Sequence, residues 1–150
     1  YGGYHPELGL ILRQAKEKGL KAGFMGPEGV GNASISQIAQ DASEGLLVTL
    51  PKSFDQDPSN KALVEAFAAK KEDPSGPFVF PAYAAVEVIA DGIKNAKSED
   101  TAKVAAAIRA GTFKTPTGDL SFDSKGDLKD FKFVVYTWHK DGTKTEAPLK

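Results

Sequence analysis

The sequence predicts an α/β fold in which helices pack on a parallel β-sheet. In the first fifty residues, short apolar segments alternate with segments whose apolar residues recur at helical spacing, an order typical of parallel strands joined by helices. The apolar segments 20–25 and 46–50 are continuous and do not alternate with polar residues. Continuous apolar strands indicate burial on both faces of the sheet.

The chain begins like the end of a strand, at Tyr1, and a helix is predicted from about residue 6 to residue 18. Pro6 suits the first turn of that helix, and Gly19 suits its end. Its inward stripe is predicted to be Leu8, Ile11, Leu12 and Ala15. A second helix follows the glycine-rich loop 26–32, with Ile35, Ile38, Ala39 and Ala42 inward and Gly45 at its end. Because the chain starts at a strand end, we expect it to be a fragment.

Three further helices are predicted in the middle of the chain. Ser59 and Ser98 are predicted to be the N-caps of the third and fifth helices, and Gly111 is predicted to end the fifth. The third helix has an inner face of Leu63, Val64, Phe67 and Ala68. The fourth follows the cluster of helix breakers at 73–77, and its apolar positions are Tyr83, Val86, Ile89, Ala90 and Ile93.

After Thr112 the pattern changes to strands and turns. Turns are predicted at 115–118, 123–127 and Asp141-Gly142, and Leu120 and Phe122 alternate with polar neighbours as in a half-buried strand. The segment 131–138 is rich in aromatic and β-branched residues and predicts the clearest strand of the chain.

The composition argues against several classes of function. The chain has 19 basic and 20 acidic residues, a net charge of −1, so there is no charge excess to attract nucleic acid. It has no cysteine and only two histidines, far apart, so the usual zinc motifs are absent. The glycine-rich loop 26–32 lacks the Gly-Lys-Ser/Thr ending of a phosphate-binding loop. We therefore expect no catalytic residue, no metal and no cofactor.

Two loops are predicted to hold ligand-binding residues, because open parallel sheets bind ligands beyond the carboxyl ends of their strands. They are 2–5, which contains Tyr4, and 26–32, which contains Glu28. The Glu28 carboxylate either binds an ammonium group or is a solvated loop glutamate. Tyr4 either stacks on a ligand or belongs to the core, and position alone slightly favours the core. In segment 78–80, one of two phenylalanines points into a cleft, or both are core residues.

Four segments resemble one family with high specificity. They are 1–7 (YGGYHPE), 24–32 (FMGPEGVGN), 73–76 (DPSG) and 125–129 (KGDLK). Together they resemble the leucine-specific and leucine/isoleucine/valine-binding proteins of bacterial importers, in family order and over nearly the whole chain. The resemblance implies a type I periplasmic binding protein, with doubly wound parallel sheets in two lobes, of which this chain is the C-terminal part. Residues 1–50 would then belong to the C-terminal lobe, 51–128 to the N-terminal lobe, and 129–150 would return to the C-terminal lobe.

The resemblance also implies a function and a site. The protein would bind a small aliphatic amino acid, leucine above all, between the lobes, in the periplasm, for a membrane ABC permease. By this resemblance Glu28 binds the α-ammonium group, Gly29 allows close backbone approach, Tyr4 packs near the ligand backbone and Phe78 forms part of an apolar wall. Phe80 stands where the family often has Trp. The missing N-terminal part of the protein would supply the contacts to the carboxylate group of the amino-acid ligand. The alternative is a receptor sensor domain, or half of an engineered biosensor, on the same fold.

Overall fold

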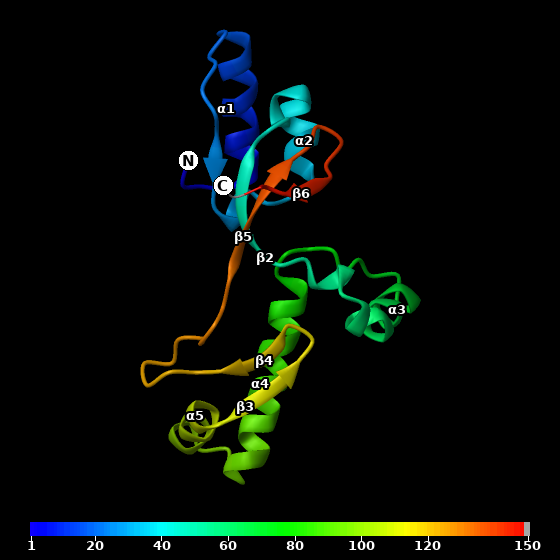
Figure 1. Ribbon diagram of the computed structural model, residues 1–150. Coiled ribbons are helices and arrows are strands. Elements are labelled where there is room, and N and C mark those ends of the chain that lie inside the picture. Colours follow the sequence, from blue (N-terminus) through cyan, green and yellow to red (C-terminus); the bar gives the residue numbers. More distant parts are fainter. Residues whose placement is uncertain (149–150) are drawn as a thin grey trace. The chain divides into compact units, whose positions relative to one another are not determined.

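The computed structural model describes residues 1–148 and divides into two compact units (Figure 1). Unit 1 consists of Tyr1–Lys52 and the segment that begins at Lys132, and unit 2 is Ser53–Phe131. The chain therefore leaves unit 1 once and returns to it once. In the described part of the chain, no helix is both long enough and apolar enough to cross a membrane.

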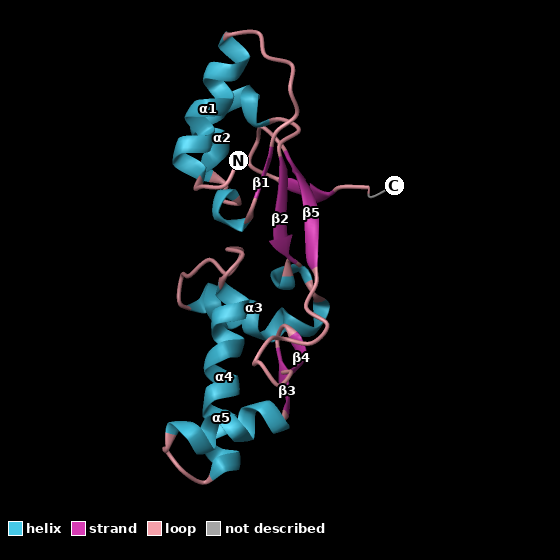
Figure 2. Cartoon of the chain, turned by 90° about the vertical axis from the view of Figure 1, so that its left-hand side faces the viewer, coloured by secondary structure: helices cyan, strands magenta, loops and turns pink. Residues whose placement is uncertain are grey.

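Unit 1 is a four-stranded sheet with two helices. The sheet has the order β1-β2-β5-β6, formed by Met25–Gly26, Leu47–Pro51, Phe133–Trp138 and Lys144–Glu146. The helices α1 (His5–Glu17) and α2 (Ser34–Ala39) lie on the same side of the sheet (Figure 2). Two short 3-10 helices, η1 (Glu28–Val30) and η2 (Gln40–Ser43), connect these elements.

The sheet of unit 1 is parallel at one end and antiparallel at the other. β1 runs parallel to β2, as predicted, whereas β5 is antiparallel to both β2 and β6. The predicted strand 20–25 was too long, because only Met25 and Gly26 pair with β2. Residues 20–23 are exposed. Without a partner for its backbone N–H and C=O groups, an apolar segment does not become a strand.

The core of unit 1 lies between the two helices and the sheet. It contains ten buried residues: Leu8, Leu12, Val30, Ile35, Ala39, Leu46, Val48, Leu50, Tyr136 and Trp138. The buried face of α1 is narrower than predicted, because Leu8 and Leu12 are buried but Ile11 is exposed. Gly9 brings α1 close to α2, since a Cβ added there would lie 2.7 Å from Ile38 Cγ2. This close contact holds α1 against α2, and Tyr4 lies directly before the first residue of α1.

Unit 2 consists of three helices and a β-hairpin. The helices are α3 (Lys61–Ala69), α4 (Val79–Ala96) and α5 (Thr101–Ala110), preceded by the short helices η3 (Phe54–Gln56) and η4 (Pro58–Asn60). The hairpin is formed by β3 (Thr112–Thr115) and β4 (Gly118–Ser121), which pair in antiparallel fashion around the predicted turn 115–118. Asn60, which is buried, joins the parts of the unit, since its Nδ2 donates to Phe54 O at 2.9 Å and to Pro116 O at 2.8 Å.

Two predicted N-caps of unit 2 were wrong. Asp57 caps η4 by accepting a hydrogen bond from Ser59 N, and Asn60 stands at the start of α3 without a side-chain cap. Asp100, and not Ser98, caps α5 by accepting from Lys103 N at 3.0 Å. In both cases an aspartate lies within two residues of the predicted serine. A carboxylate is favoured there because it also interacts with the positive end of the helix.

The predicted inner face of α4 was also wrong. The buried residues of the helix are Phe80, Ala84, Val88 and Gly92, whereas Tyr83, Val86, Ile89 and Ile93 are exposed. Small residues decide this orientation, because they let α5 approach closely. A Cβ added at Gly92 would lie 2.5 Å from Ile108 Cγ1. The helix therefore has two apolar faces, and only one of them is buried.

Candidate functional site

The loop before α1 places Tyr4 on the surface of unit 1. Tyr4 is the N-cap residue of α1 in extended conformation, and its carbonyl accepts a hydrogen bond from Leu8 N at 3.2 Å. Leu8 is fully buried and holds the start of the helix against the core. The Tyr4 side chain is 70% exposed, so the core interpretation of this residue was wrong.

The turn after β1 carries Glu28 and Gly29. Its residues form the 3-10 helix η1, closed by hydrogen bonds from Val30 N to Pro27 O and from Gly31 N to Glu28 O. Val30 is fully buried and anchors the turn in the core. The glycines on either side permit this packing, since an added Cβ would lie 2.6 Å from Val30 Cγ2 at Gly26 and 2.5 Å from Leu50 Cδ2 at Gly31.

The structure brings these two segments together. A Cβ added at Gly29 would lie 3.2 Å from both Gly3 O and Tyr4 Cδ1, so the glycine lets the turn contact the loop before α1. The nitrogen of Tyr1 donates to Met25 O at 3.0 Å, so the residues just before the loop and just before the turn are also in contact. Tyr4, Glu28 and Gly29 therefore form one cluster beyond the carboxyl end of β1, as the sequence predicted.

The Glu28 carboxylate is free to accept hydrogen bonds. The residue is half-buried, and within residues 1–148 its side chain makes neither a hydrogen bond nor an ion pair. A carboxylate can bind a cation through charge-assisted hydrogen bonds, and an exposed aromatic ring such as that of Tyr4 can bind one through its face. Among the residues that the structure describes, no group of three or more His, Asp or Glu side chains could hold a metal ion.

Phe78 lies in unit 2, where it is the N-cap residue of α4. Its side chain is 54% exposed, whereas Phe80 is buried among the rings of Phe54 and Phe67, with centroids 6.5 and 6.4 Å away. The interpretation in which both aromatic residues belong to the core was therefore wrong. The observed arrangement has one ring in the core and one at the surface, which leaves Phe78 available for a ligand.

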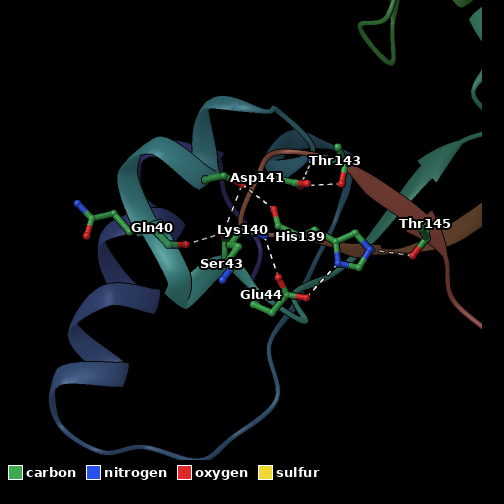
Figure 3. Close-up of polar contacts among 9 residues, drawn as sticks. Gln40, Ser43, Glu44, His139, Lys140, Asp141, Thr143 and Thr145 are labelled. Carbon is green, nitrogen blue, oxygen red and sulfur yellow. Dashed lines mark hydrogen bonds and ion pairs between the residues drawn. The ribbon is translucent and has the colours of Figure 1, made fainter.

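A second polar cluster in unit 1 was missed by sequence reasoning (Figure 3). His139 Nδ1 lies 3.0 Å from Glu44 Oε1, and His139 Nε2 lies 3.0 Å from Thr145 Oγ1. Lys140 N donates to the other Glu44 oxygen at 3.0 Å. The hydrogen bond from His139, and then that from Lys140, lowers the pKa of the Glu44 carboxyl. Glu44 and His139 are 95 residues apart, so no local pattern could have paired them.

This second cluster has a structural role. Glu44 precedes β2, His139 follows β5, and Thr145 lies in β6. Ser36 of α2 donates to His139 O at 3.0 Å and connects this helix to the network as well. The contacts therefore fix the last two strands against the rest of unit 1, and the Glu28 carboxylate takes no part in them.

Open α/β sheets bind ligands beyond the carboxyl ends of their strands, and Tyr4, Glu28 and Gly29 lie at such an end. The sequence model of the family described as periplasmic binding protein matches residues 2–143. The chain belongs to this family.

Individual relatives agree with this assignment. The chain is 67% identical over 147 residues to the leucine-, isoleucine-, valine-, threonine- and alanine-binding protein of Pseudomonas aeruginosa, covering 98% of the chain and 39% of the relative. It is 54% identical to the Leu/Ile/Val-binding protein of Escherichia coli K12, covering 98% of the chain and 40% of the relative. The chain thus spans about 40% of the length of these relatives.

Solved structures show the same fold. A leucine-binding protein of Thermotoga maritima superposes with a TM-score of 0.83 at 27% identity, over 98% of this chain and 42% of that one. The branched-chain amino-acid transporter substrate-binding protein of Streptococcus pneumoniae, solved with isoleucine, gives a TM-score of 0.75 at 21% identity, over 97% of this chain and 43% of that one. The predicted type I periplasmic binding protein fold is confirmed.

Proposed function

We propose that the chain is the C-terminal part of a periplasmic protein that binds a small aliphatic amino acid, leucine above all, and delivers it to an ABC-type permease. The observation that carries this proposal is the Glu28 side chain, which is half-buried and makes no hydrogen bond or ion pair within the described residues, and whose neighbour Gly29 packs against the exposed residue Tyr4. The names of its relatives, which are proteins that bind leucine, isoleucine and valine, support the substrate class.

In this proposal each site residue has a defined role. Glu28 accepts hydrogen bonds from the α-ammonium group, and Tyr4 packs on the ligand backbone. Gly29 keeps the turn close to Tyr4 and leaves its own backbone accessible. Phe78 contributes to the apolar wall around the aliphatic side chain, whose burial is worth roughly 1.5–3 kcal/mol. The protein binds without catalysis, metal, cofactor or nucleic acid.

The proposal assigns the parts of the chain to two lobes. Residues 1–50 and 129–150 belong to the C-terminal lobe, and 51–128 to the N-terminal lobe, with residues 149–150 outside the described structure. The missing N-terminal part of the protein completes both lobes and holds the ligand carboxylate. Nothing in the comparisons supports the alternative of an engineered biosensor half.

The test is Glu28→Gln in the complete polypeptide, with leucine binding measured by calorimetry. Loss of the carboxylate leaves a buried ammonium group without its counter-charge, and we expect affinity to fall by about 2–5 kcal/mol. The control is Glu7→Gln, which changes an exposed glutamate in the first turn of α1. A second arm uses 4-methylpentanoate, which lacks the ammonium group, and its weaker binding should not be reduced further by the substitution. Unchanged leucine affinity would remove Glu28 from the site.

A further inference from the structure

The turn that carries Glu28 is held by few hydrogen bonds of its own. The 3-10 helix η1 has three residues and no side-chain cap at its start. Besides the two hydrogen bonds that close it, Asn32 N donates to Val30 O at 2.9 Å, in a turn centred on Gly31. Hydrogen bonds of 3-10 geometry are poorer than those of an α-helix, so side-chain packing has to fix the position of such a turn.

Gly31 is the residue through which the turn contacts β2. A Cβ added there would lie 2.5 Å from Leu50 Cδ2, 3.1 Å from Leu50 Cδ1 and 3.2 Å from Glu28 O. Its backbone angles, φ −77° and ψ 51°, are those of an inverse γ-turn, which other residues also adopt. The glycine is therefore required here for space and not for conformation. The methyl groups of Leu50 and the carbonyl group of Glu28 meet at this one residue.

Leu50 is a fixed support for the turn. It is fully buried in the core of unit 1 and lies in β2, which has a neighbouring strand on each side. Its register partner in β5 is Val134, and the next residue, Pro51, pairs with Phe133. Close packing of this kind restricts a side chain to one rotamer. Because Leu50 is fully buried, its side chain does not reach a solute at the Glu28 cluster, and it acts on that cluster only through Gly31.

We propose that Leu50 is a positioning residue of the amino-acid site, whose side chain packs against Gly31 and sets where the turn presents the Glu28 carboxylate. This inference rests on the proposed function, in which that carboxylate binds the α-ammonium group. Charge-assisted hydrogen bonds need their two heavy atoms about 2.7–2.9 Å apart, and a binding group keeps such geometry only where packing locks the residues behind it. Leu50→Ala opens a space beside Gly31 into which the turn can move.

The experiment measures leucine binding by calorimetry in the complete polypeptide, with Leu50→Ala made alone and together with Glu28→Gln. Alone, Leu50→Ala should weaken leucine binding about tenfold, whereas together with Glu28→Gln it should cause no further loss, because the carboxylate that it misplaces is already absent. Leu50→Met conserves the side-chain volume and should keep the wild-type affinity. The control is Leu46→Ala, which removes the same atoms from another buried leucine of this core and should leave the affinity unchanged.

Amide hydrogen exchange without any amino acid tests the packing itself. The N–H groups of Val30 and Gly31, which close the turn, should exchange faster in Leu50→Ala than in Leu46→Ala, and equal rates overturn the proposal. Wild-type leucine affinity in Leu50→Ala, or the same loss with and without Glu28→Gln, also overturns it. If Leu50→Ala does not fold, Leu50→Val takes its place, with a smaller effect in the same direction. A wild-type polypeptide that binds no leucine would reject the proposed function, and the exchange rates would still decide whether Leu50 holds the turn.

Discussion

The turn that carries Glu28 depends on a contact that admits no side chain at Gly26. A Cβ added there would lie 2.6 Å from Val30 Cγ2 and 3.3 Å from Val30 Cγ1. Val30 is fully buried and β-branched, so its methyl groups have no free rotamer into which they can turn. Overpacking of this kind costs about 1–3 kcal/mol, partly offset by the 0.4–1 kcal/mol or so that a Gly→Ala change gains from the unfolded chain. We expect Gly26→Ala to destabilise unit 1 by about 1–2 kcal/mol.

The matched control is Gly23→Ala, three residues earlier. Gly23 has no atom within 4 Å of an added Cβ and does not need a left-handed backbone, so the change should be neutral or stabilise by up to about 1 kcal/mol. Urea unfolding followed by fluorescence reports on unit 1 directly, because Trp138 is the only tryptophan and lies in its core. If the two variants unfold within about 0.5 kcal/mol of each other, the contact at Gly26 does not constrain the turn.

Three further predictions concern the rest of the chain. The pKa of Glu44 is lowered in the folded protein, so its stabilising effect is present above its ordinary value of 4.5 and is lost as the pH falls further. The urea midpoints of the wild-type chain and Glu44→Gln should therefore differ at pH 7 and converge at pH 3, whereas Glu146→Gln, at an exposed position of β6, should show no such trend. Asn60→Ala should destabilise unit 2 by about 1–3 kcal/mol and speed amide exchange in β3–β4, because Pro116 O loses its buried donor; exchange at the wild-type rate would contradict this. The 150-residue chain should bind leucine weakly or not at all, and micromolar affinity by calorimetry would refute that expectation.

Local patterns predicted most helices, and a rule about strand ends predicted that Tyr4 and Glu28 lie in loops at the same edge of the sheet. The helix after Pro6 and the strand at 46–50 lie close to their predicted bounds, because apolar periodicity and helix-ending residues are short-range signals. The association of Tyr4 with Gly29 followed from a rule about parallel strand ends, which needs no knowledge of individual contacts. The exposure of Tyr4 did not follow, because burial depends on what else reaches that edge of the sheet.

Long-range pairing and the choice between equivalent faces could not be predicted in the same way. The strand 20–25 was shortened by the lack of a neighbouring strand, which no property of its own residues reveals. On α4, Tyr83, Val86 and Ile89 form as good a stripe as Phe80, Ala84 and Val88. The choice between the two faces depends on tertiary contacts, namely those of Gly92 with Ile108 and of Phe80 with the rings of Phe54 and Phe67. The pairing of Glu44 with His139 is likewise a product of the finished fold.

The register of β2 with β5 makes unit 2 an insertion into unit 1. Pro51, where the chain leaves the sheet, is the direct antiparallel partner of Phe133, where it returns. Partners of this kind have Cα atoms only about 4.5–5.5 Å apart, a distance that a two-residue hairpin turn can bridge. If unit 2 were removed or replaced between these two residues, a short turn could join β2 directly to β5, and the sheet of unit 1 would remain continuous.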